Sequence, residues 1–160
     1  MFKTSVKSKD NSGALAKLMK DLSEKQVYVG IPEEKAPRKK GEISNAQLMF
    51  IHTNGSPLRN IPARPVIESA IEATGNKEPI VNELAQAAQA ALDLKPGEAN
   101  QHLKLAGMLG QNAARAWFTD PRNGWPPDAP ETVKRKGSER PLIDTGQMRK
   151  AIIYVIKDEK

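Results

Sequence analysis

The stretch GWPPDAPETVKRKGSERPLIDTGQMRKAIIYVI, residues 124–156, decides the fold. Trp125 stands before Pro126 and Pro127, and a residue that precedes proline favours extended geometry, so we expect an extended arm over residues 119–141. The β-branched run at residues 152–156 predicts a strand, and the residues from Gln147 onward predict a short helix before it. The stretch therefore predicts an arm, a basic turn, a short helix and a final strand, in that order.

The triplet Asp144-Thr145-Gly146 lies where the short helix begins. An Asp or Thr side chain can accept hydrogen bonds from the first amides of a helix, and Gly146 permits a tight entry. Asp-Thr-Gly after apolar residues also marks the half-site of aspartic proteases, which need two carboxylates sharing a proton inside a long β-barrel. Only 14 residues follow, from Gln147 to Lys160. We therefore predict a structural cap and no catalytic residue.

The rest of the chain supplies the partners of this C-terminal strand. The β-forming run that begins with VYVGI predicts a strand at Val27–Ile31, and its expected antiparallel partner covers Ala151–Lys157. Alternation at Phe2–Val6 predicts a further strand. The fold class that follows is α+β, with a small, mainly antiparallel sheet packed against a helical hairpin, extended Pro-rich loops, and one domain over residues 1–160.

Apolar spacing predicts the helices. Ser12 and Ser44 are expected to cap two of them, and Pro65 is expected to open a third. Residues 80–94 and 98–118 form the predicted αα-hairpin, broken by Lys-Pro-Gly. Small residues recur four apart at Ala106, Gly110 and Ala114, so we expect the two helix axes of the hairpin to approach closely.

Composition narrows the function. The formal net charge of +6 favours acidic partners, and the absence of cysteine excludes disulfides, thiolate nucleophiles and cysteine-bound metals. No apolar run has the length of a signal peptide or a membrane span, so we expect neither export nor a membrane partner. His52 and His102 have no cysteine or paired carboxylate arranged around them in the sequence, and no nucleotide-binding fingerprint occurs. We predict no metal and no cofactor.

Two segments carry clustered positive charge. Residues 33–42 form an expected flexible basic loop with Arg38, Lys39 and Lys40, which either contacts DNA or an acidic neighbour or is simply a solvated loop. The turn at residues 134–140 begins with Lys134 and Arg135, and it either binds phosphate backbone non-specifically or is solvated. The sequence leaves both alternatives open.

The pattern W-P-P-x-A-P-x-T-x-x-R-K-G-S-x-x-P-L-I-D-T-G-Q-M-R, residues 125–149, resembles the C-terminal signature of neck and tail-completion proteins of tailed bacteriophages. A second block, IHTNGSPLRNIPARPVIESAIE at residues 51–72, resembles the Ile-Pro-Ala-Arg-Pro block of the same proteins. Two blocks in the expected order are more specific than either alone. With the strand VYVGIP, the resemblance extends from about Val27 onward, although the helical middle matches in character only.

The resemblance implies a structural virion protein at the head–tail junction, assembled in the host cytoplasm as part of a homo-oligomeric ring. The implied partners are a connector, stopper, tail terminator or tail tube protein, with non-specific contact to channel DNA as a further role. The alternative is a basic DNA-binding accessory protein that forms no ring. Salt dependence of DNA binding would separate the two.

Stiff or basic segments are the expected assembly contacts, because stiff segments lose little entropy on docking. The residues assigned to this interface are Arg38, Lys39, Lys40, Ile61, Pro62, Arg64, Trp125, Pro126, Pro127, Lys134 and Arg135. Arg64 either bridges to a carboxylate of the next subunit or tethers its loop within the chain. Trp125 either anchors a partner or folds back on its own hairpin.

Overall fold

The computed structural model describes residues 9–35 and 43–159. The expected strand at residues 2–6 and the basic residues Arg38, Lys39 and Lys40 lie outside these ranges. The elements follow in the order α1 (Ser12–Ser23), β1 (Lys25–Gly30), η1 (Glu33–Lys35), α2 (Asn45–Asn54), η2 (Pro57–Arg59), α3 (Ile67–Glu72), α4 (Lys77–Leu92), α5 (Pro96–Trp117), η3 (Pro121–Asn123), α6 (Pro130–Lys136), α7 (Gln147–Ala151) and β2 (Ile153–Asp158).

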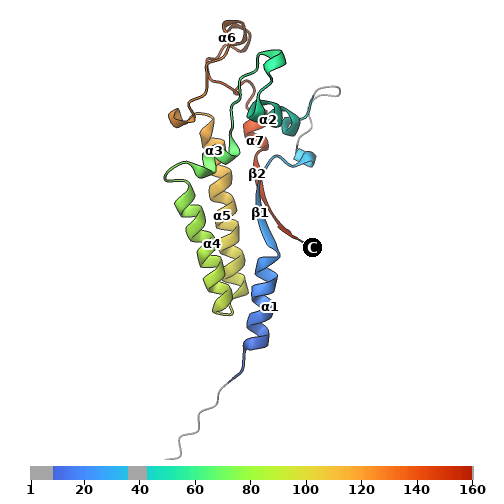
Figure 1. Ribbon diagram of the computed structural model, residues 1–160, viewed down its shortest axis with the longest axis vertical. Coiled ribbons are helices and arrows are strands. Elements are labelled where there is room, and N and C mark those ends of the chain that lie inside the picture. Colours follow the sequence, from blue (N-terminus) through green and yellow to red (C-terminus); the bar gives the residue numbers. More distant parts are fainter. Residues whose placement is uncertain (1–8, 36–42, 160) are drawn as a thin grey trace, which may run out of the picture.

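The fold class is α+β, as predicted. Figure 1 shows an elongated molecule in which the α4–α5 hairpin runs beside the strands, with α2, α3, α6 and α7 gathered at one end. α1 packs against α4 at the other end. In residues 9–35 and 43–159, no helix combines the length and the apolar character needed to cross a bilayer.

The two strands pair antiparallel, with Val27 opposite Ile156 and Val29 opposite Tyr154. Residues that lie directly opposite one another share a face of the sheet. One face, with Val27, Val29 and Tyr154, lies against α5, where these side chains approach two glycines of that helix. The other face carries Tyr28 and Val155 and is turned away from α5. β1 starts at Lys25, two residues before its predicted start, and β2 starts at Ile153, two residues after its predicted start.

The αα-hairpin forms as predicted, and two glycines of α5 have a role that the sequence did not indicate. A Cβ atom at Gly107 would lie 2.8 Å from Cγ of Tyr154, and one at Gly110 would lie 3.0 Å from Cγ2 of Val29. The closest neighbours of both glycines are therefore strand side chains and not residues of α4. The glycines bring the sheet close to α5, while alanines such as Ala87 and Ala114, both fully buried, fill the helical layers.

Helix α2 has the predicted cap. Ser44 accepts a hydrogen bond from the amide of Gln47 at 3.2 Å, and the Gln47 side chain accepts one from the amide of Ser44 at 2.9 Å. This reciprocal pair is a capping box. The expected Ser12 cap is wrong, because α1 starts at Ser12 itself, and the carboxylate of Asp10 accepts the Ser12 amide hydrogen bond at 2.9 Å. α3 starts at Ile67, two residues after Pro65.

The predicted extended arm over residues 119–141 is also wrong in part. Residues 124–129 carry no helix or strand, as expected, but α6 occupies Pro130–Lys136. Pro130 fits the first turn of a helix, and Gly137 ends it in the left-handed conformation at φ 68°. Pro130, which lies inside the predicted arm, therefore starts a helix.

The triplet before α7 does not cap it as expected. The residue at the cap position is Gly146, with φ 73°, and the helix has no side-chain cap bond. Thr145 Oγ1 accepts the Gln147 amide at 3.4 Å, which is long for a hydrogen bond, and the Asp144 side chain is exposed. Entry into α7 depends on the left-handed glycine rather than on Asp144 or Thr145.

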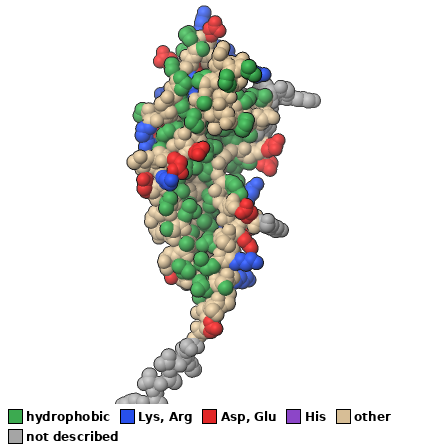
Figure 2. Space-filling view, in the orientation of Figure 1, with side chains coloured by type: hydrophobic (Ala, Val, Ile, Leu, Met, Phe, Trp, Pro, Cys, Tyr) green, Lys and Arg blue, Asp and Glu red, His purple; other side chains and the backbone are tan. Residues whose placement is uncertain are grey.

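The main core lies at the end of the molecule that holds α2, α3 and α7. Phe118, Val66 and Ile152 are its largest fully buried side chains. A smaller cluster of Ala90, Ala91 and Ala99 lies at the turn of the αα-hairpin. Figure 2 shows hydrophobic side chains that remain exposed near α2 and α3 and along the hairpin.

Candidate functional site

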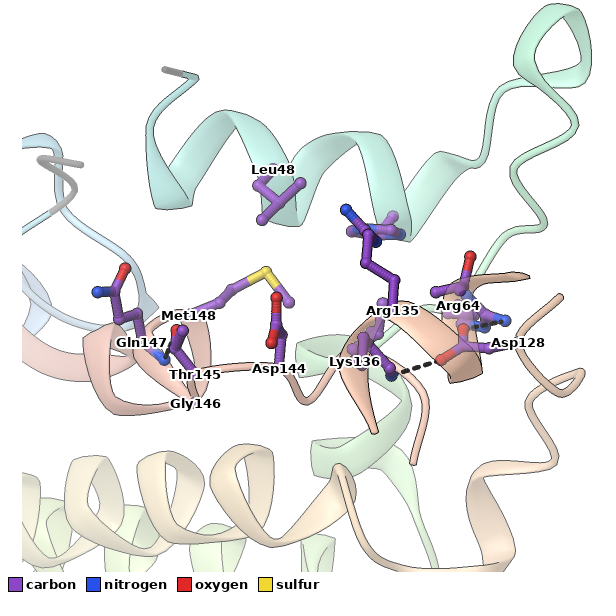
Figure 3. A pocket seen from close by; sticks show the side chains of 13 residues that line it. Leu48, Arg64, Asp128, Arg135, Lys136, Asp144, Thr145, Gly146, Gln147 and Met148 are labelled. Atoms are coloured by element: carbon purple, nitrogen blue, oxygen red, sulfur yellow. Dashed lines mark hydrogen bonds and ion pairs between the residues drawn. The ribbon is translucent and has the colours of Figure 1, made fainter. Parts of the chain in front are cut away.

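The two sequence blocks that were singled out, residues 51–72 and 125–149, meet around one cavity of about 300 Å³. Its wall comes from α2, the loop before α3, the segment before α6, α6 itself and the turn before α7. The lining residues are Leu48, His52, Arg64, Asp128, Thr132, Arg135, Lys136, Leu142, Asp144, Thr145, Gly146, Gln147 and Met148. In Figure 3, Leu48 and Met148 point toward one another across this cavity.

A buried group of three charges holds the blocks together. Asp128 receives Arg64 Nη2 at 3.1 Å on one oxygen and Lys136 Nζ at 2.5 Å on the other. The three side chains are only 5–7% exposed. We call these residues, Arg64, Asp128 and Lys136, the ion-pair cluster. It places two cations and one carboxylate in the interior, where unpaired charge is expensive.

Backbone carbonyls accept further hydrogen bonds from the two cations of the ion-pair cluster. Arg64 donates to the carbonyl of Pro126 from Nε at 3.2 Å and from Nη2 at 2.8 Å, and to the carbonyl of Pro127 at 3.0 Å. Lys136 donates to the carbonyl of Arg140 at 2.6 Å. Residues 124–129 form no helix or strand, so the carbonyls of Pro126 and Pro127 can accept from the guanidinium, which fixes the segment before α6 against the loop before α3.

Trp125 makes a second link between the same segments. Its ring nitrogen donates to the carbonyl of Pro65 at 3.1 Å, and its ring meets Phe118 edge-on with centroids 5.9 Å apart. The indole is partly buried against the main core. Of the two alternatives for Trp125, the structure shows the one in which it folds back on its own chain.

His52 lies on α2 beside the ion-pair cluster. Burial of the ring, together with the positive charge of Arg64, lowers the pKa of His52 from its ordinary value, while the carboxylate of Asp128 opposes that shift. Among the described residues its Nδ1 atom has no hydrogen-bond partner. A neutral imidazole therefore faces a cavity whose buried groups carry a net positive charge.

Two further charges, Arg135 and Asp144, point into the open part of the cavity (Figure 3). Both residues are exposed. Asp128 and Asp144 are the carboxylates of the wall, but both oxygens of Asp128 are already bound by cations. Asp128 is therefore paired with Arg64 and Lys136 and not with Asp144, unlike the two paired carboxylates of aspartic proteases. Within the described ranges, residues 9–35 and 43–159, no group of three His, Cys, Asp or Glu side chains is placed to hold a metal ion.

The described residues of the predicted interface differ in exposure. Arg64 is 4% exposed and bonded within its own chain, which corrects its assignment to the assembly interface and confirms the intrachain tether. Trp125 is only partly exposed. Ile61 is partly buried, and the remaining described residues of the set, Pro62, Pro126, Pro127, Lys134 and Arg135, are exposed and stay predicted contacts.

Sequence reasoning missed Asp128 and Lys136. Asp128 stood at the variable position of W-P-P-x-A-P, and Lys136 belonged to a basic run that is normally solvated. An acid placed between prolines, eight residues before a lysine, gave no signal of burial. Sequence reasoning also missed Arg115 of α5, whose guanidinium donates to the carbonyl of Ile152 at 2.9 Å, next to the start of β2.

Comparison of the chain with protein-family models, curated proteins and solved structures gives no match.

Proposed function

We propose that the chain is a structural virion protein at the head–tail junction of a tailed phage. It completes the neck or tail as part of a ring around the DNA channel, and its work is binding rather than catalysis. One observation carries this proposal: the two blocks with the phage resemblance are bonded to each other through Arg64 and Trp125, whose partners lie 63 and 60 residues away in the sequence. A shared signature that builds one unit is stronger support than two unconnected matches.

The bonded unit suits docking. The prolines at positions 62, 126 and 127 are exposed, while the backbone beside them is held by Arg64. A surface that is already rigid loses little conformational entropy when it binds a neighbour. The buried carboxylate of the cavity wall, Asp128, is bound on both oxygens by Arg64 and Lys136, as suits a group with a structural role.

A second function is favoured by charge. The net charge is +6, and Lys134 and Arg135 are exposed on α6. A basic DNA-binding accessory protein without ring assembly would use such a surface on phosphates. Lys136, the third basic residue of this run, is turned inward to Asp128, so the helix offers fewer free cations than its sequence suggests.

The test is the place of the chain in a particle. Particles assembled without the chain should show heads and tails that fail to join, and density for the chain should lie at the neck in particles assembled with it. Light scattering of the purified chain, with and without DNA over a series of salt concentrations, separates the second function. Normal joining without the chain, or steep salt-dependent DNA binding with no oligomer, would overturn the neck proposal.

A further inference from the structure

The loop between α2 and α3 presents an unusual side chain. Leu58, in η2 at its tip, is 99% exposed, the highest value among the exposed large hydrophobics of the described chain. We call residues 55–63 the Leu58 loop. A lone exposed leucine is ordinary on a protein surface. A leucine held fully in solvent by a rigid loop is less ordinary, so the rigidity of this loop decides the argument.

The Leu58 loop is fixed by its own backbone. The amide of Ser56 donates to the carbonyl of Ile61 at 2.8 Å, and the amide of Ile61 donates back to the carbonyl of Ser56 at 3.0 Å. At its base, Gly55 has φ 72°, and a Cβ there would lie 2.8 Å from the amide nitrogen of Ala63. Asn60 takes the left-handed conformation that closes the turn. The loop therefore holds Leu58 outward in one geometry.

A hollow that could accept such a side chain lies on the face of the sheet turned away from α5. A hollow of about 470 Å³ extends over Gly30, between Tyr28, Pro32, Ile153 and Val155. Among the described residues, a Cβ atom built at Gly30 would meet nothing within 4 Å, so this part of the chain leaves the hollow open above Gly30. Tyr28 is 45% exposed beside it. We call this hollow the outer groove.

The Leu58 loop and the outer groove are on different parts of one molecule. Figure 1 shows the loop after α2 at the end of the molecule near α6, whereas β1 and β2 run along its middle. A contact between one patch and a different patch of a second copy is heterologous, and repetition of such a contact generates a ring when the rotation closes.

One set of described charges beside the two patches is complementary, although the sequence that follows Glu34 is basic. Arg59 follows Leu58 and is exposed. Glu33 and Glu34 follow Pro32 at one end of the outer groove and are also exposed. Lys157 lies at the other end of the groove. Opposite charges steer association and set the orientation of an apolar contact, so they favour an approach with Arg59 toward the two glutamates.

We propose that Leu58 of one copy of this chain inserts into the outer groove of a second copy, over Gly30, with Arg59 against Glu33 and Glu34. The inference rests on the proposed ring and names the contact that builds it. Two apolar surfaces leave water, and neither has to rearrange, because the loop is fixed and the groove is open.

The chain has no cysteine, so engineered cysteines report contacts without background. Full-length Leu58→Cys and Val155→Cys proteins are mixed, oxidised mildly and analysed by mass spectrometry of the linked peptides. We expect the mixed disulfide to form about tenfold faster than with Leu92→Cys in place of Leu58→Cys, because Leu92 is an exposed leucine outside the loop. A disulfide between two Leu58→Cys copies alone, or equal rates, overturns the proposal.

Two substitutions test the contact without cross-linking. Leu58→Asp and Gly30→Val should each weaken self-association by at least about tenfold in sedimentation experiments. Both should leave unfolding midpoints unchanged or, for Gly30→Val in a strand, slightly raised. Arg59→Glu should weaken association too, and Glu33→Arg with Glu34→Arg in the mixed partner should restore it. Unchanged association in these variants, or a wild-type chain that stays monomeric, overturns the contact.

Failure here is distinguishable from failure of the neck function. If the wild-type chain forms a ring that tolerates Leu58→Asp, the contact is wrong and the ring stands. If the contact is found but particles join normally without the chain, the contact stands and the neck function is wrong.

Discussion

The two ends of this molecule are held by different kinds of contact. At the α4–α5 turn, regular helices pack through alanines, and the buried residues are Ala90, Ala91 and Ala99. At the other end, loops and short helices surround Phe118 and the buried ion-pair cluster. The end at the α4–α5 turn is held by several similar contacts between small side chains. The other end depends on individual ion pairs and hydrogen bonds, so we expect single substitutions there to lower the free energy of unfolding more strongly.

The largest effect is expected from Asp128→Asn. The change keeps the shape of the side chain but leaves Arg64 and Lys136 buried side by side without their carboxylate, which should lower the free energy of unfolding by about 3–5 kcal/mol. Urea unfolding followed by circular dichroism measures it.

Asp144→Asn is the matched control for this change, because its carboxylate lines the same cavity but is exposed. It should change the free energy of unfolding by no more than about 0.5 kcal/mol. Adding Lys136→Met to Asp128→Asn should recover part of the loss, since only one buried cation then remains. Similar small effects of Asp128→Asn and Asp144→Asn would contradict the importance of the ion-pair cluster.

A smaller effect is expected where the hairpin meets the sheet. Gly107→Ala places a methyl group against the ring of Tyr154 and should destabilise the chain by about 1–3 kcal/mol. Gly97→Ala, in the same helix with nothing within 4 Å of the new Cβ, should stabilise it by about 0.4–1 kcal/mol. Thermal melts of the two variants should therefore shift in opposite directions. A shift of the same sign in both would mean that helix propensity outweighs packing at Gly107.

These contrasts explain what the sequence could predict. Local signals were sufficient for the two strands, the helices of the αα-hairpin and the Ser44 cap, because each depends on neighbours in the chain or on repeated spacing. The α+β class followed from them. Asp128 and Lys136 could not be predicted, because their burial is set by Arg64, which lies more than 60 residues away in the sequence.

Errors arose where one residue type serves two local structures. Pro130 fits both an extended arm and the first turn of a helix. In the structure it starts α6, which ends at left-handed Gly137. Asp144 and Thr145 are typical caps, yet left-handed Gly146 occupies the cap position. The phage resemblance selected the blocks that build the cavity, but only coordinates could show that Arg64 serves its own chain.

A loss of stability smaller than that of Asp128→Asn is expected when the hydrogen bond from Trp125 to Pro65 is removed. Trp125→Phe keeps an aromatic ring near Phe118 but removes the donor to the carbonyl of Pro65, so we expect a loss of about 1 kcal/mol in urea unfolding. Tyr28→Phe removes a hydroxyl whose bond to Gln26 is exposed, and it should change the free energy of unfolding by less than about 0.5 kcal/mol. A Trp125 variant as stable as the Tyr28 variant would leave the ion-pair cluster as the only strong tie between the two blocks.

The smallest effect is expected from the titration of His52, because one ring carries it. Burial, aided by the charge of Arg64, lowers the pKa of His52 in the folded chain below 6.5, which is its value without these influences. As the pH falls through 6.5, the unfolded chain takes up a proton at this residue before the folded chain does, so the free energy of unfolding decreases. The stabilising difference is present above pH 6.5 and is lost toward the lower folded pKa. His52→Gln removes it, and unfolding in urea at a series of pH values should show wild type losing stability more steeply than the variant between about pH 7 and pH 5.5. Parallel curves would mean that the ring is solvated well enough to titrate as it does in the unfolded chain, and that the cavity end of the molecule is more open than its buried charges imply.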